Sequence, residues 1–201
     1  LLARVSGPPP DAAPLISQWS GAAPPLSFNQ ERLWFLQALE PASSVYTETE
    51  LLFVAGPLDV AILRQSVATV AARHEILRTV IAEDATGARV QRVEAAGPIA
   101  IAEDTVDGPA AAWVAAATAR AQALGQEVFV LTRGPLWRVR VLHGPADRAA
   151  LVVTVHHVIA DGWSLGVFLR EVGAAYTAWR RGAAPREAPR AVQYGDYAAW
   201  E

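Results

Sequence analysis

Cysteine, methionine and lysine are all missing from this chain of 201 residues. Without cysteine the chain has neither disulfides nor thiolate metal sites, and this fits a reducing compartment. The N-terminus lacks a basic stretch followed by an apolar core, and the chain has no uncharged apolar run of about 18 residues. These absences indicate no secretory signal and no membrane span, so we expect a cytoplasmic protein.

The charge balance gives no sign of a charged partner. A net charge of −3 provides no electrostatic reason to bind nucleic acid or anionic lipid. The basic residues are all arginine and alanine is abundant, which is typical of a biased genome composition rather than of a binding surface. Because methionine is absent even from position 1, we expect the chain to be a processed or excised piece.

Hydrophobic residues make up 52% of the chain, enough for one sizeable core or two small ones. Residues 1–25 are rich in proline, glycine and alanine, which indicates a linker or a strap on the surface. Residues 182–189 form a second proline-rich connector. The folded part is therefore expected mainly between these two segments.

Hydrophobic periodicity predicts the regular elements of that part. We expect helices over 28–39, from the cap Asp59 to about 73–75, over 109–124, over 164–180, and from 194 to 200. We expect strands over 47–55, 76–83, 89–93, 99–103, 136–143 and 149–155. In the third helix the core candidates are Trp113, Val114, Ala117 and Leu124. Because strands and helices do not alternate regularly, the fold class should be an α/β sandwich, with a mixed sheet flanked by helices.

Two histidines, His156 and His157, end the nearly uniformly apolar strand 149–155, and Asp161-Gly162 follow. Successive strand side chains point to opposite faces, so one histidine should face the interior and the other a cleft. The pair is a poor metal site for the same reason, and we expect no metal. Asp161 should support the turn, while Gly162 lets backbone or substrate approach closely. Ser164 should help to start the next helix.

A histidine at the end of this strand can take part in proton transfer. A neutral histidine near pH 7 can accept a proton from an attacking amine or hydroxyl, which typically gives about 10²–10⁴-fold in rate. Alternatively, His157 positions the nucleophile and stabilises charge in the tetrahedral intermediate. Asp161 either orients a histidine or pairs with a buried arginine. A histidine pair alone is usually structural, but the full HHxxxDG spacing favours catalysis. Without cysteine or a G-x-S-x-G elbow, a covalent acyl-enzyme is disfavoured.

Four segments carry a resemblance to a known family. They are 27–36 (SFNQERLWFL), 73–79 (RHEILRT), 156–162 (HHVIADG) and 194–200 (YGDYAAW). In this order they resemble motifs of the condensation domains of nonribosomal peptide synthetases, within the chloramphenicol-acetyltransferase-like superfamily. The first segment has Asn29 where alanine is usual.

The resemblance implies two acetyltransferase-like lobes in a V shape around a tunnel. Donor and acceptor carrier proteins dock at opposite faces, each delivering an aminoacyl or peptidyl thioester on phosphopantetheine. The acceptor amine attacks the donor thioester and an amide forms. The lobe itself is expected to bind no cofactor. Residues 26–181 would be the N-terminal lobe, and 182–201 the connector and the start of the crossover to a C-terminal lobe.

The resemblance also assigns roles to residues. It implies that His157 is catalytic and that His156 is structural. Asp161 is expected to pair with Arg73 as first choice, or with Arg78 as second. The substrate tunnel is expected to be bordered by Gly162, Trp163 and Ser164.

Several alternatives stay open. The first motif resembles domains that join two L-configured residues. An ester-forming relative shares HHxxxDG, although the second and fourth motifs favour amide formation. A non-catalytic lobe that docks carriers or recruits other enzymes usually has a damaged HHxxxDG, which is intact here. A complete condensation domain is roughly twice this length and sits beside an adenylation domain, so the lobe alone is expected to be inactive.

Overall fold

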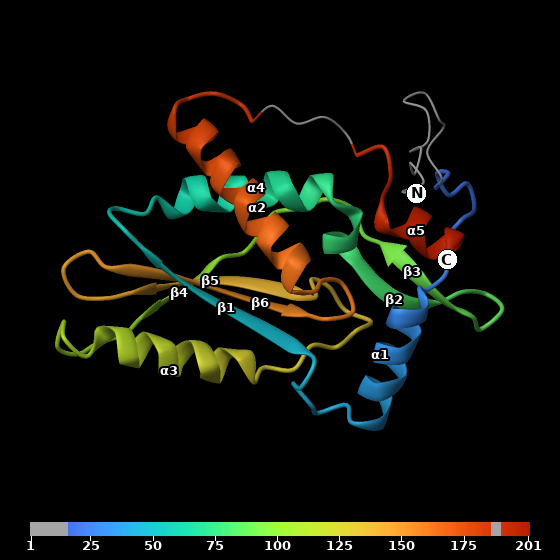
Figure 1. Ribbon diagram of the computed structural model, residues 1–201, viewed down its shortest axis with the longest axis horizontal. Helices are drawn as coiled ribbons and strands as arrows, with labels where there is room; N and C mark the ends of the chain where they lie inside the picture. Colours follow the sequence, from blue (N-terminus) through green and yellow to red (C-terminus); the bar gives the residue numbers. More distant parts are fainter. Residues whose placement is uncertain (1–15, 186–189) are drawn as a thin grey trace, which may run out of the picture.

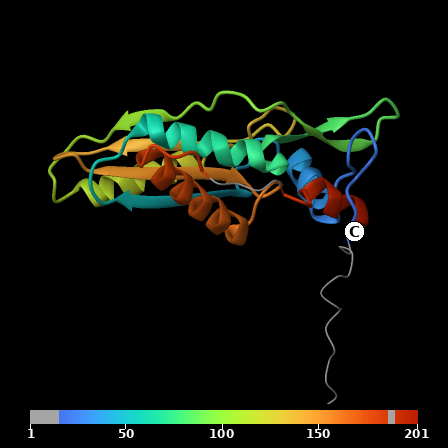
Figure 2. The ribbon, with the colours of Figure 1, turned by 90° about the horizontal axis from the view of Figure 1, so that it is seen from above.

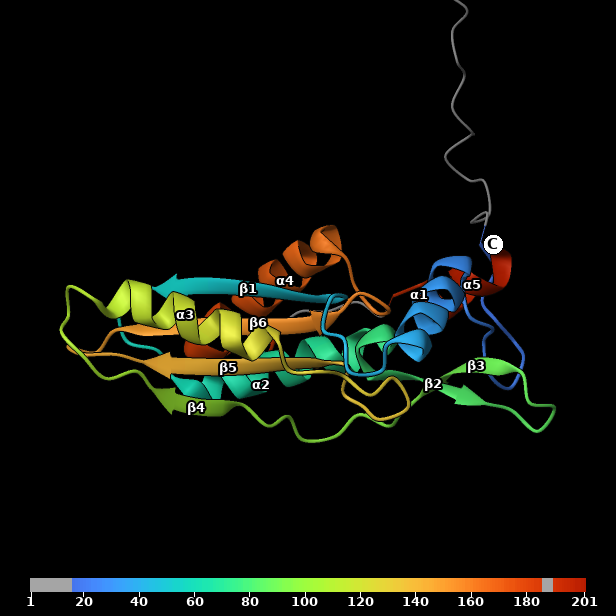
Figure 3. The ribbon, with the colours of Figure 1, turned by 90° about the horizontal axis from the view of Figure 1, so that it is seen from below.

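The computed structural model describes residues 16–185 and 190–201, and a four-stranded mixed sheet lies at its centre. The strand order is β1-β6-β5-β4, in which only the β4–β5 pair is parallel. Helices α2 and α4 cover one face and α3 covers the other (Figures 1, 2 and 3). The predicted mixed sheet flanked by helices is confirmed.

The central strands agree closely with the predicted ones. The sheet consists of β1 (Thr47–Val54), β4 (Ala102–Thr105), β5 (Trp137–His143) and β6 (Ala149–His156). Strand β6 lies between two neighbours and is buried along almost its whole length. Its near-continuous apolar sequence suits a strand covered on both faces. The short edge strand β4 begins at 102, three residues later than the predicted start at 99.

The helices are α1 (Phe28–Leu39), α2 (Val60–Arg73), α3 (Trp113–Gly125), α4 (Gly162–Arg180) and α5 (Tyr194–Trp200). Ser27 and Asp59 cap α1 and α2 as predicted, each accepting a backbone N–H from the first turn. Helix α3 starts at 113 rather than 109. Its buried stripe includes Trp113, Ala117 and Leu124, but Val114 is 51% exposed. The assignment of Val114 to the core was wrong, because one helical step turns it off the sheet-facing stripe.

A separate hairpin lies at one end of the molecule. It consists of β2 (Thr79–Glu83) and β3 (Arg89–Val93), joined by the predicted turn around Asp84. A strand from residue 76 was predicted here, but Glu75–Arg78 form a 3₁₀ turn, η1. The turn is fixed by tertiary contacts, since the Trp137 indole donates to the carbonyl of Leu77 at 2.7 Å.

The described part of the N-terminal segment runs over this end. The amide of Gln91 on β3 donates to the carbonyl of Pro24, and the amide of Trp19 donates to Asp196 on α5. Residues 16–25 therefore connect the hairpin to α5 across the surface. Residues 1–15 of the predicted strap, and residues 186–189 of the predicted connector, lie outside the described residues.

Candidate functional site

The two histidines at the end of β6 face opposite sides, as the strand period predicted. The His156 residue is buried, with 2% of its surface exposed. The His157 side chain keeps 35% of its surface exposed. The His157 amide donates to the carbonyl of Tyr46 at 2.8 Å, so the backbone pairing with the β1 side continues past the strand end.

The His156 ring is held by bonds at both nitrogens. Its Nδ1 accepts the amide of Val158 at 3.0 Å, so the ring proton resides on Nε2. Nε2 then donates to Oε1 of Gln37 at 3.2 Å. Burial, and secondarily the neighbouring His157, lower the pKa of His156 to about 4. The ring is therefore neutral at pH 7 and has no free nitrogen for a substrate.

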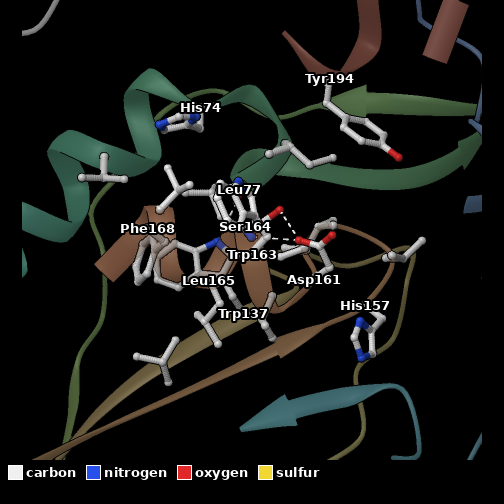
Figure 4. A pocket seen from close by; sticks show the side chains of 18 of the residues that line it. His74, Leu77, Trp137, His157, Asp161, Trp163, Ser164, Leu165, Phe168 and Tyr194 are labelled. Atoms are coloured by element: carbon white, nitrogen blue, oxygen red, sulfur yellow. Dashed lines mark hydrogen bonds between the residues drawn. The ribbon is translucent and has the colours of Figure 1, made fainter. Parts of the chain in front are cut away.

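The His157 ring lies at a cavity of about 250 Å³. Figure 4 shows this cavity where the end of β6 meets the start of α4 and the turn after α2. Its apolar walls include Leu77, Trp137, Leu165 and Phe168, and its polar lining includes His74, His157, Asp161, Ser164 and Tyr194. A mainly apolar cavity with a few convergent polar groups is typical of a small-molecule site.

Asp161 caps the helix that borders the cavity. Its Oδ1 accepts the amide of Ser164 at 2.8 Å and the hydroxyl of Ser164 at 2.6 Å. The Ser164 hydroxyl, followed by its amide, lowers the pKa of Asp161. Helix α4 consequently starts at Gly162, two residues before the predicted start, with Asp161 rather than Ser164 as its cap.

The predicted pair between Asp161 and an arginine is contradicted. Arg73 Nη1 lies 3.4 Å from Glu171 on α4, and Arg78 donates to backbone carbonyls, that of Ala71 at 3.1 Å. Ten helical residues separate Glu171 from Asp161, or about 15 Å at 1.5 Å per residue. The packing of α2 along α4 therefore brings Arg73 to the wrong turn for Asp161.

Glu171 also accepts from His74 at 2.7 Å and from Arg190. Because these three basic residues come from the end of α2 and the segment before α5, Glu171 joins both to α4. This cluster could not be recognised from the sequence, since α2 and α4 are about 100 residues apart.

The three predicted tunnel residues stand in different positions. Trp163 and Ser164 border the cavity, and Trp163 is 81% exposed. Gly162 does not border it, but a Cβ added at Gly162 would meet only Oε1 of Glu48, at 3.6 Å, within the described residues. Within the described residues there is therefore space for a small side chain at Gly162.

Sequence reasoning missed Glu48, which lies on β1 beside His157. Its Oε1 is 3.7 Å from Nε2 of His157. The alternating acidic residues of Thr47–Val54 resemble those of a solvated edge strand. The sequence therefore gives no sign that Glu48 lies at the site. Only the antiparallel register, which pairs Glu48 with Val155, shows that it is next to the histidine turn.

The first and fourth motif segments support the same turn. The side-chain amide of Gln30 on α1 donates to the carbonyl of Val158 at 3.2 Å. The hydroxyls of Ser27 and Tyr194 are 2.9 Å apart. These segments thus converge on the histidine turn although they are far apart in sequence.

In residues 16–185 and 190–201, no group of three or more His, Asp or Glu side chains could hold a metal ion. Within the same ranges, none of the helices combines the length and apolar character that crossing a bilayer requires.

Comparison with known proteins gives a consistent result. The family model described as Condensation domain matches residues 22–201. The chain is 37% identical over 175 residues to the cyclosporin synthetase simA of Tolypocladium inflatum, covering 87% of this chain and 1% of that protein. It is 36% identical over 177 residues to the phosphinothricin tripeptide synthetase PhsC of Streptomyces viridochromogenes, covering 88% and 16%. The chain therefore spans a small part of these relatives.

Several solved structures are similar to this chain as well. The X-domain from teicoplanin biosynthesis superposes with a TM-score of 0.80 at 36% identity, covering 92% of this chain and 39% of that chain. The X-domain has also been solved in complex with OxyB, and that structure has a TM-score of 0.81 at 35% identity. The starter condensation domain of rhizomide synthetase superposes with a TM-score of 0.74 at 25% identity, covering 84% and 40%.

Proposed function

Because the chain belongs to the condensation-domain family, we propose that it is the N-terminal catalytic lobe of an amide-forming condensation domain. The reaction joins aminoacyl or peptidyl groups that carrier proteins present as phosphopantetheine thioesters. The observation that carries this proposal is the position of His157. Its ring lies at a cavity, while its neighbour His156 is buried and bonded at both nitrogens.

The chemistry follows from these positions. The acceptor amine attacks the donor thioester carbonyl, a C–N bond forms, and the amine must lose a proton. His157 accepts this proton, or holds the amine and the developing charge. His156 is the structural partner in this proposal, because its ring proton is committed to Gln37.

The partners in this proposal are donor and acceptor carrier proteins, a C-terminal lobe and a neighbouring adenylation domain, in the cytoplasm. A second lobe is supported by coverage, since the chain matches 39% of the X-domain chain and 40% of the rhizomide domain. The exposed Trp163 and the open side of Gly162 would border the tunnel between the lobes. The lobe alone is therefore proposed to be inactive, and its first motif supports L-configured donor and acceptor residues.

The test uses the synthetase that contains this chain, with carriers loaded with defined donor and acceptor residues. His157→Ala should abolish the condensed product, measured by mass spectrometry of the acceptor carrier. His143→Ala is the matched control, because His143 lies on β5 beside Glu103 and outside the cavity. Normal product formation by a folded His157→Ala variant would overturn the proposal. An acceptor carrying a hydroxy acid in place of an amino acid tests ester formation.

A second candidate is a recruitment lobe that binds another enzyme. The X-domain likeness favours it, because that domain was solved in complex with OxyB. The intact HHVIADG segment favours catalysis. Two results together would favour recruitment. The His157→Ala synthetase would keep full product formation, and the synthetase without this lobe would no longer co-purify with another enzyme.

A further inference from the structure

Glu48 is an acidic group placed directly beside the His157 ring. The carboxylate oxygen Oε1 lies 3.7 Å from Nε2 of His157, within ion-pair distance but beyond hydrogen-bond distance. The imidazole nitrogen is therefore not consumed by a bond to Glu48. Nε2 of His157 can therefore still bind a substrate atom, while the negative charge of the Glu48 carboxylate acts on the ring.

The second oxygen of this carboxylate is unusual. Glu48 Oε2 is buried and, among the described residues, has no hydrogen-bond partner. A buried unsatisfied carboxylate oxygen is costly unless a nearby positive charge compensates it. The basic group beside this carboxylate is the His157 ring, so protonation of that ring would supply the compensation.

Among the other titratable groups around His157, Asp161 also interacts with its charge, as the weakest of the causes that lower the Asp161 pKa. Asp161 is committed to the amide and hydroxyl of Ser164. His156 is neutral at pH 7 and bonded at both nitrogens. His74 and Tyr194 also line the cavity, but His74 binds Glu171 and Tyr194 bonds Ser27.

We propose that Glu48 is a positioning residue for His157, which holds the ring on the β1 side and stabilises its protonated form. Figure 4 shows the His157 ring on the side of the cavity where β1 runs. The role rests on the proposed condensation function. As the amine nitrogen bonds to the thioester carbon, its proton moves to His157, and the carboxylate stabilises the imidazolium. Collapse of the intermediate breaks the C–S bond, and the proton passes to the leaving sulfur.

One experiment tests the coupling without using catalysis. Diethyl pyrocarbonate modifies only unprotonated imidazole, so the pH dependence of His157 modification, followed by peptide mass spectrometry, reports its protonation. In the protein that carries this chain, Glu48→Gln should move the midpoint of this curve to lower pH. Glu50→Gln is the matched control, since it removes the same charge from an exposed site two residues along β1. It should leave the midpoint in place.

A second measurement tests the consequence for the reaction. The single-turnover rate of condensation should fall about two- to fivefold in Glu48→Gln, the range for losing a partly exposed ion pair. Glu48→Asp keeps the charge and should recover part of the rate, and Glu50→Gln should not change it.

The outcomes separate the two proposals. An unchanged midpoint in a folded Glu48→Gln variant overturns the role of Glu48 whatever the turnover. A shifted midpoint together with normal turnover in His157→Ala overturns the condensation proposal and leaves the coupling intact. If Glu48→Gln and Glu50→Gln shift the midpoint equally, the shift comes from the general surface charge. That result would also overturn the proposed role of Glu48.

Discussion

His156 on β6 donates a hydrogen bond to Gln37 on α1, and this bond links the strand that ends at the candidate site to the end of a distant helix. The Gln37 amide nitrogen in turn donates to three carbonyls beyond α1, including that of Ser43 at 3.1 Å. The orientation of the Gln37 amide and the tautomer of His156 are thus fixed together. Replacing Gln37 should therefore destabilise the fold by loss of hydrogen bonds. His156 should make the stability of the fold depend on pH.

Gln37→Leu should destabilise the fold. The substitution leaves the buried His156 Nε2–H without an acceptor. It also removes the Gln37 donor from three carbonyls, of which that of Glu40 still accepts the amide of Ser43. Leaving one buried polar group unsatisfied costs about 1–3 kcal/mol. Chemical denaturation at pH 7 measures the change. Gln122→Leu, at an exposed position on α3, is the control and should change stability little. Equal stability of both variants would show that the Gln37 network contributes nothing.

His156 should make the stability fall as the pH falls. Its pKa is about 4 in the folded protein and 6.5 when unfolded, so the unfolded chain binds the proton more readily between these values. The loss begins below pH 6.5 and is complete near pH 4, reaching about 3 kcal/mol at most. Urea denaturation at several pH values measures it. His156→Asn should flatten the curve over this range, whereas His143→Asn should keep it. A steep curve in both variants would assign the effect to other groups.

Asp161→Ala should destabilise α4, because it removes the acceptor for the Ser164 amide and hydroxyl. Losing such a cap typically costs about 0.5–2 kcal/mol. Asp161→Asn keeps an oxygen that can cap, so it should recover most of the loss in thermal or urea denaturation. If Asp161→Ala keeps its stability but condensation is lost, Asp161 has a direct role in the reaction instead.

Gly162→Ala should fold at least as stably as the original chain. The added Cβ meets only Glu48 Oε1 at ordinary contact distance within the described structure, and alanine is favoured over glycine in a helix by up to about 1 kcal/mol. Gly162→Leu should also fold, yet lower the condensation rate if the open side of Gly162 borders the tunnel. Melting temperature and product formation, measured on the same samples, separate the effects. A destabilised Gly162→Ala variant would show that the glycine serves the fold itself.

Local sequence rules determined a large part of this protein. Period-two alternation placed His156 and His157 on opposite faces, and caps such as Ser27 and Asp59 set the starts of two helices. These features depend on neighbours within a few residues, so they can be read directly from the sequence. The order of the four motif segments along the chain likewise indicated the family.

Only the tertiary structure decided which distant groups meet. The packing of α2 along α4 brought Arg73 to Glu171 rather than to Asp161. The contact of Trp137 with Leu77 accompanies a 3₁₀ turn where alternation predicted a strand. The register of β1 against β6 placed Glu48 beside His157. Each outcome depends on how whole elements pack, and residue spacing along the chain carries no information about that packing.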